Sequence, residues 1–159
     1  MHAPRAVLRT LLRTVPDALH EQGFARLVTH LLRGQSLVRR LPPLVGRCLA
    51  LEITDTGNRW RFRITATGLE RDPQAGPWDV RIRGPLADLL ALAARREDPD
   101  TLFFARRLSL EGDTEAALYL KNLLDALEFD LDAHLEAVLG PLPAALLPPQ
   151  LRRLVASSW

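Results

Sequence analysis

Side chains that could act as nucleophiles are few and poorly placed for catalysis. Cys48 is the only cysteine of the 159 residues, and it lies in an alternating segment typical of a β-strand. A structural thiol is expected there, and a single cysteine excludes an intrachain disulfide. No serine sits in a strand–serine–helix elbow; the serines are Ser36, Ser109, Ser157 and Ser158. The sequence therefore predicts no catalytic residue.

Metal and cofactor chemistry has no better support. The histidines do not pair with one another or with the cysteine at ligand spacing; they are His2, His20, His30 and His134. Two aspartate pairs border helix-breaking sequence, where capping and turn roles are expected; they are Asp98 with Asp100, and Asp130 with Asp132. Neither a GxGxxG nor a GxxxxGK run is present to hold a phosphate. No metal and no cofactor are predicted.

A row of arginines raises the question of nucleic acid binding. Arginines alternate with apolar residues in two segments; the arginines are Arg59, Arg61, Arg63, Arg81 and Arg83. Strand alternation predicts that Trp60 and Trp78 lie on the face opposite these arginines. Base stacking combined with phosphate binding needs both kinds of side chain on one face. We therefore expect no nucleic acid partner.

Charge is unevenly spread along the chain, although the net charge is only +2. Residues 1–50 are rich in arginine, whereas residues 97–136 are rich in acids. Near the N-terminus, Arg5, Arg9 and Arg13 form a stripe opposite an apolar helix face. This pattern is typical of a helix in a membrane interface, and equally of a terminal helix packed on its own domain. The first interpretation makes the three arginines membrane-docking residues, and both remain open.

The length suits one domain with a hydrophobic core. No apolar run approaches the roughly 20 residues that span a bilayer, and Arg9 and Arg13 interrupt any signal-peptide core. We expect a cytoplasmic protein, with peripheral contact to the inner membrane as a further option.

Periodicity changes along the chain from helix to strand and back. A helix is expected from Asp17 to about Gly34. Alternating segments then predict strands; they cover residues 48–53, 59–64, about 65–71, 78–83 and about 106–111. Further helices are expected after Gly84-Pro85, after Asp113 and in the proline-rich tail. Segregated elements of this kind predict an α+β domain, a sheet covered by helices on one face.

One stretch resembles a known family. The cues are the segments DTLFF at 100–104, RRL at 106–108, EGDTE at 111–115 and KNLLD at 121–125. Together they resemble the sterol carrier protein type-two family, in particular its bacterial branch of lipid-carrier accessory factors for ubiquinone biosynthesis. The N-terminal helical extension and the proline-rich tail suit the branch that serves the oxygen-independent route.

The resemblance implies a mixed five-stranded sheet with helices on one face and an apolar tunnel between them. It divides the chain into N-terminal amphipathic helices (1–34), a lipid-binding domain (35–130) and a C-terminal helical lid (131–159). It implies a non-enzymatic carrier of ubiquinone, its prenylated precursors or phospholipid, serving the oxygen-independent hydroxylase pair and other ubiquinone-biosynthesis proteins. The residues expected to contact lipid are Leu51, Trp60, Phe62, Trp78, Val80, Phe103, Phe104, Leu108, Leu120, Leu124, Leu147 and Leu151.

Pattern alone leaves other functions open. The same apolar residues could fill an ordinary core rather than line a cavity. An accessory factor of the aerobic pathway or a general phospholipid carrier would share the pattern. A transferase or hydrolase with a tunnel lacks its nucleophile and base, and an interaction module would use the acidic face.

Overall fold

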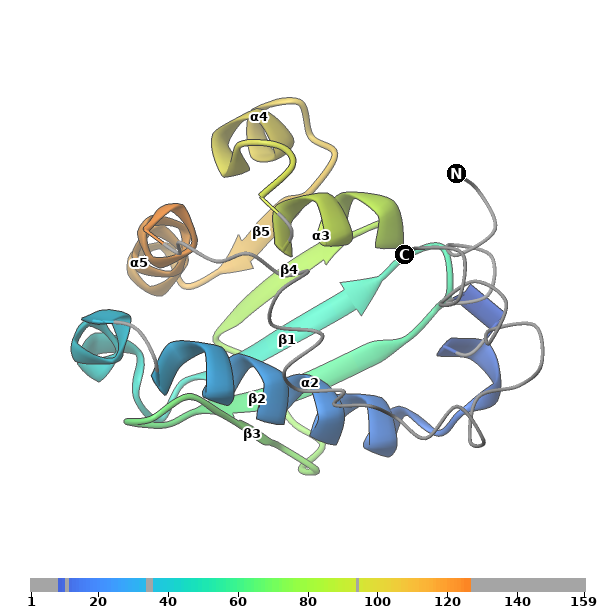
Figure 1. Ribbon diagram of the computed structural model, residues 1–159, viewed down its shortest axis with the longest axis horizontal. Coiled ribbons are helices and arrows are strands. Elements are labelled where there is room, and N and C mark those ends of the chain that lie inside the picture. Colours follow the sequence, from blue (N-terminus) through green and yellow to red (C-terminus); the bar gives the residue numbers. More distant parts are fainter. Residues whose placement is uncertain (1–8, 11, 34–35, 94, 127–159) are drawn as a thin grey trace, which may run out of the picture.

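The computed structural model describes residues 9–10, 12–33, 36–93 and 95–126, which form one sheet and the helices around it (Figure 1). The elements are α2 (Asp17–Arg33), the 3₁₀ helices η1 (Ser36–Arg40) and η2 (Pro42–Leu44), β1 (Cys48–Ile53), β2 (Arg59–Ile64), β3 (Leu69–Arg71), β4 (Val80–Gly84), α3 (Leu86–Ala93), α4 (Pro99–Phe104), β5 (Ser109–Gly112) and α5 (Thr114–Asp125). The predicted C-terminal lid lies outside the described residues.

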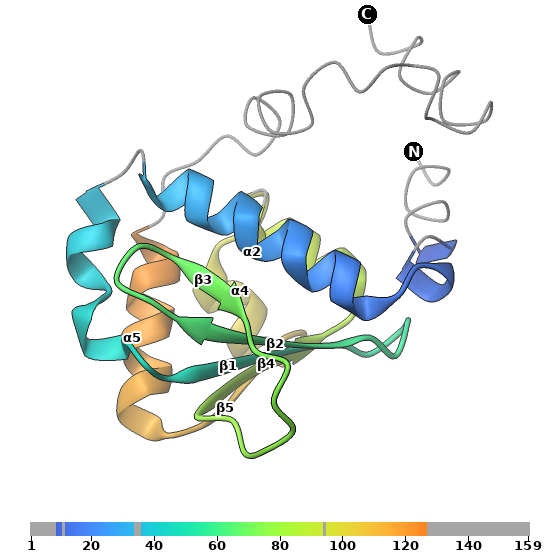
Figure 2. The same ribbon diagram turned by 90° about the horizontal axis from the view of Figure 1, so that it is seen from below.

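The strands form a mixed five-stranded sheet in the order β3-β2-β1-β4-β5. Strands β1 and β4 are parallel, and the other neighbours are antiparallel. The helices lie on one face of this sheet, as Figures 1 and 2 show from two directions. The predicted α+β class and the predicted mixed sheet are both confirmed.

Alternation within the strands gives the sheet an apolar face beneath the helices. The hairpin of β1 and β2 has the predicted bounds, and Leu51 is opposite Trp60 in its register. Phe62 of β2 and Val80 of β4 are almost completely buried. The period of two therefore places one set of side chains in the core and leaves the other on the outer face.

Helix α2 packs on the edge of the sheet and shares its core. The Phe24 ring lies 5.7 Å from the Trp60 ring and 5.3 Å from the Phe62 ring, centroid to centroid. The Thr29 hydroxyl donates to the Leu69 carbonyl at 3.1 Å and accepts from the Leu69 N–H at 3.0 Å. The predicted helix from Asp17 is confirmed, and these contacts attach it to β2 and β3.

The region before β5 differs from the prediction. Helix α4 spans residues predicted only as a chain break, and β5 begins at Ser109 rather than at residue 106. The Asp98 carboxylate caps α4 by accepting from the Thr101 N–H at 3.1 Å. Pro99 occupies the first turn, where its missing N–H costs nothing. Asp-Pro is a helix-start signal as well as a break, which explains the missed helix.

Candidate functional site

The apolar interior between the sheet and the helices holds half of the twelve residues expected to contact lipid. These six are buried; they are Leu51, Trp60, Phe62, Val80, Leu108 and Leu120. Leu124 and Phe103 are half-buried, whereas Leu147 and Leu151 lie outside the described residues. Both described faces of the candidate site, sheet and helix, are therefore apolar.

Two buried clusters divide this apolar interior. The larger joins the sheet to α2 and α5, and the smaller consists of Leu92 of α3, Leu102 of α4 and Leu108. Leu124 of α5 and Leu89 of α3 pack against both clusters. Leu124 therefore lies at the seam between the two clusters.

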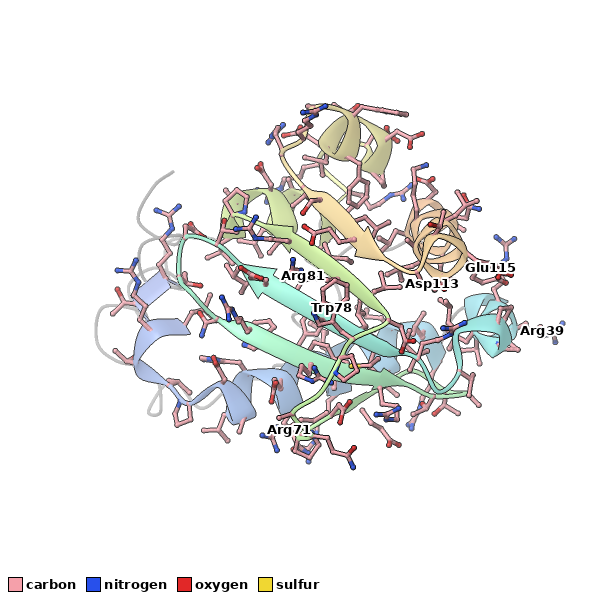
Figure 3. All side chains as sticks on the ribbon, turned by 180° about the vertical axis from the view of Figure 1, so that it is seen from behind. Arg39, Arg71, Trp78, Arg81, Asp113 and Glu115 are labelled. Atoms are coloured by element: carbon pink, nitrogen blue, oxygen red, sulfur yellow. The ribbon has the colours of Figure 1, made fainter. Side chains whose placement is uncertain are left out.

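Phe104 and Trp78 do not take the places expected of them. Phe104 ends α4 with 83% of its surface exposed, so it points away from the interior. Trp78 lies on the outer face of the sheet, where the Arg81 guanidinium carbon is 4.7 Å from the ring centroid (Figure 3). The chain bends at Asp79 before β4 begins, and this bend breaks the alternation on which the prediction for Trp78 rested.

Trp78 and Arg81 therefore share one face, contrary to the expected separation of aromatic rings from the arginine row. The guanidinium covers the ring in a cation–π contact, which occupies the face a base would stack on. The separation of the rings from the arginines therefore no longer argues against nucleic acid binding. The expected absence of a nucleic acid partner stays a prediction.

Acidic side chains neutralise much of the arginine row on this outer face. Glu52 accepts from Arg81 and Arg83 at 3.2 Å each, and Arg59 is 4.0 Å away. The bond from Arg81 lowers the pKa of Glu111 on β5 below its ordinary value.

A hollow of about 570 Å³ opens on the outer face beside Trp78. A second hollow, of about 850 Å³, lies between α2 and β3. Since neither lies over Phe62 on the helix-covered face, the predicted tunnel stays a proposal.

Possible reactive groups are occupied by structural contacts. Cys48 is buried, its pKa is raised by desolvation, and its sulfur accepts from Arg61 at 3.2 Å. Within the described residues no cluster of His, Cys, Asp and Glu could hold a metal ion. Asp98 caps a helix, as expected, whereas Asp100 forms an ion pair with Lys121.

Two of the three expected membrane-docking arginines bind the protein itself. Arg9 forms an ion pair with Asp55 at 2.7 Å, and Arg13 donates to the Asp55 carbonyl at 3.0 Å. Leu12 between them is buried in the larger cluster. Arg5 lies outside the described residues. These contacts favour the packed terminal helix over a helix free to lie in a bilayer.

Among the described residues, no helix combines the length and the apolarity needed to cross a membrane. Phe24 and Val28 of α2, whose spacing predicts the apolar side of that helix, were not among the residues expected to contact lipid, yet they pack against the larger cluster. Their helical spacing with Leu31 and Leu32 marks an apolar face of α2, but spacing alone does not show that this face covers the sheet.

Known proteins match both the sequence and the fold. The model of the SCP-2 sterol transfer family matches residues 27–125. The ubiquinone biosynthesis accessory factor UbiT of Escherichia coli strain K12 is 37% identical over 130 residues, which cover 82% of this chain and 74% of the relative. The same values hold for UbiT of E. coli O157:H7.

A solved structure described as the ubiquinone synthesis protein UbiJ-SCP2 superposes with a TM-score of 0.56 at 19% identity, over 70% of this chain and 97% of that one. This likeness shows the shared fold. Family model and sequence relatives agree, and the chain belongs to the SCP-2 sterol transfer family, in the branch that contains the accessory factor UbiT.

Proposed function

We propose that the chain is a non-enzymatic carrier that holds a polyprenylated ubiquinone intermediate or a membrane lipid during ubiquinone biosynthesis. The observation that carries the proposal is the apolar interior between sheet and helices, whose half-buried members Phe24, Leu89 and Leu124 border the core. The 37% identity to a ubiquinone biosynthesis accessory factor supports the same function.

The energetics favour a hydrocarbon guest. Burial of hydrocarbon contributes about 0.8 kcal/mol per CH₂, so one isoprene unit contributes roughly 3 kcal/mol before the cost of association. A few units between α5 and the sheet would therefore give useful affinity. The guest would be a prenyl or acyl chain, with Leu51, Phe62 and Leu120 as contacts from the sheet and α5.

The proposal places the carrier in the oxygen-independent branch, where it would present its cargo to the hydroxylase pair from the cytoplasm or the inner-membrane surface. Its support is the resemblance of the segments around 100–125 to that branch, together with the match to UbiT. Growth of a deletion strain with and without oxygen separates this branch from the aerobic one. A ubiquinone defect confined to growth without oxygen is expected.

The direct test is lipid extraction from the purified full chain, followed by mass spectrometry. We expect a prenylated aromatic compound or a phospholipid to accompany the protein. Replacing half-buried Leu124 with Trp fills the seam and should remove most of the lipid. Leu118→Trp adds the same bulk to α5 at a position that is 58% exposed, and should keep it. A fully folded wild-type chain without lipid that also ignores prenylquinones would contradict the proposal.

A further inference from the structure

A groove of about 850 Å³ separates α2 from the edge strand β3, away from the apolar interior. Arg26, His30 and Arg33 line it from α2, at spacings of four and three residues that place them on one helix face. All three side chains are exposed. Within the described part of the chain, none of the three forms an ion pair with a carboxylate. One wall of the groove therefore carries two arginines and a histidine, and neither arginine has an ion-pair partner among the described residues.

The opposite wall adds a third arginine and hydroxyl groups. Arg71 of β3 lies on this edge of the sheet (Figure 3), and its Nε donates to buried Glu21 at 2.6 Å. That bond fixes the guanidinium and uses only one of its nitrogens. Thr65 and Thr67 line the groove from the turn between β2 and β3. Donors therefore face the groove from both sides.

One acidic residue, Glu70, lines the groove, and the strand register directs its side chain away from α2. Glu70 is opposite Arg63 in the pairing of β2 with β3, so it belongs to the outer face of the sheet. The charge of the groove thus remains positive, and an anion entering it meets no carboxylate on the α2 wall.

The two walls are held at a fixed separation. Thr29 makes two hydrogen bonds to the backbone of Leu69, at 3.0 and 3.1 Å. A Cβ atom at Gly68 would lie 2.8 Å from the Thr29 Cα, so the turn approaches α2 as closely as glycine permits. The groove is therefore preformed, and a ligand need not order its walls.

Helix electrostatics explain only part of this row of basic side chains. His30 and Arg33 lie in the last turn of α2, where positive charge complements the helix dipole. Arg26 lies about two turns before the end, beyond the reach of that effect. Apart from the His30 imidazole, no aromatic ring lines the groove, so a nucleotide base would have little to stack on. The lining therefore suits a phosphate group better than a nucleotide base.

We propose that this groove binds the headgroup phosphate of an anionic phospholipid and thereby orients the carrier on the bilayer. The inference rests on the proposed carrier function and adds the surface by which the carrier recognises a membrane. Guanidinium groups suit phosphate because they offer paired donors in a fixed plane. The groove would replace the N-terminal arginine stripe, of which Arg9 and Arg13 are held by Asp55.

The test compares binding of the full chain to phosphatidylcholine vesicles with and without phosphatidate. The double variant R26Q/R33Q should lose about thirty-fold in affinity for the phosphatidate vesicles. The control R59Q/R96Q removes the same charge from exposed side chains outside the groove and should bind nearly as wild type. Equal losses in the two variants would show general electrostatic attraction and overturn the proposal, as would no loss in either.

A measurement on the unmodified chain guards against misfolding of the variants. Short-chain phosphatidate should shift the ring resonances of His30, which lines the groove, but not those of His20, which packs 5.8 Å from the Trp60 ring. Shifts at His30 with inorganic phosphate, in a chain that does not bind phosphatidate vesicles, would assign the groove to a soluble phosphate and overturn the lipid proposal.

The carrier function is tested separately on the same variants. R26Q/R33Q should retain its co-purified lipid, because its substitutions lie outside the apolar interior. Loss of vesicle binding with lipid retained supports the groove. Unchanged vesicle binding in a chain that never carries lipid would contradict both proposals, whereas unchanged vesicle binding with lipid retained would contradict the groove alone.

Discussion

Asp79 joins three strands of the sheet. Its backbone N–H donates to the Cys48 carbonyl of β1 at 2.9 Å, and its carbonyl accepts from the Asp113 N–H, after β5, at 2.8 Å. Its carboxylate accepts from the Cys48 N–H at 2.7 Å and from Arg47 at 3.1 Å. The Cys48 N–H and then the Arg47 guanidinium hold the pKa of Asp79 below its ordinary value, against partial burial.

This lowered pKa predicts how stability depends on pH. Since the folded pKa lies below the unfolded value of about 3.9, the carboxylate stabilises the fold fully above that value. The contribution disappears as the pH falls through the lower folded pKa. Asp79→Asn should lower the free energy of unfolding by about 1–2 kcal/mol at neutral pH and flatten its decline below about pH 4. Urea unfolding across this range measures both effects.

The matched control for Asp79 is Glu70→Gln, which removes an exposed carboxylate of β3 and should change the free energy of unfolding much less at neutral pH. Parallel pH profiles for wild type and Asp79→Asn would contradict the role given to the carboxylate. A single residue accounts for this effect, because the Asp79 carboxylate accepts both from the Cys48 N–H of β1 and from Arg47.

At the scale of elements, periodicity predicted the β1–β2 hairpin and α2, because alternation and helical spacing are local properties of the sequence. It failed at Trp78, where a bend at Asp79 shifts the face on which the ring lies. It also missed α4, since Asp-Pro signals both a break and a helix start. The α2–β3 groove was beyond such reasoning, because Arg26 and Arg71 meet only in the tertiary structure.

The attachment of α2 to β3 should depend on one hydroxyl group. Thr29→Val keeps the shape of the side chain but leaves the Leu69 N–H and carbonyl without their partner. Unpaired backbone groups of this kind cost roughly 2 kcal/mol of unfolding free energy. Thr29→Ser, which retains the hydroxyl, should lose much less. Hydrogen exchange at the Leu69 amide should quicken in the valine variant. Equal stability of the two variants would show that packing alone holds α2.

The whole molecule separates two kinds of surface. The helix-covered face of the sheet is apolar at Leu51, Phe62, Ile64 and Val80. The outer face carries arginines bonded to Glu52 and Glu111, and Arg81 is one of them (Figure 3). Hydrocarbon that enters beneath the helices would therefore meet mainly apolar side chains. The outer face would stay in water or meet a polar partner.

A ligand in the interior must stabilise the whole fold, because it binds the folded chain and not the unfolded one. At a hundred times its dissociation constant, a prenylated quinone should add about 2.7 kcal/mol to the free energy of unfolding. For a chain of this size that raises the Tm by roughly 5–10 °C. Differential scanning calorimetry of the delipidated full chain measures the shift. A quinone without its prenyl tail should produce almost no rise in Tm, because the proposed affinity comes from buried hydrocarbon. Leu124→Trp should reduce the rise in Tm that the prenylated quinone produces. Equal shifts with and without the tail would place the ligand outside the apolar interior.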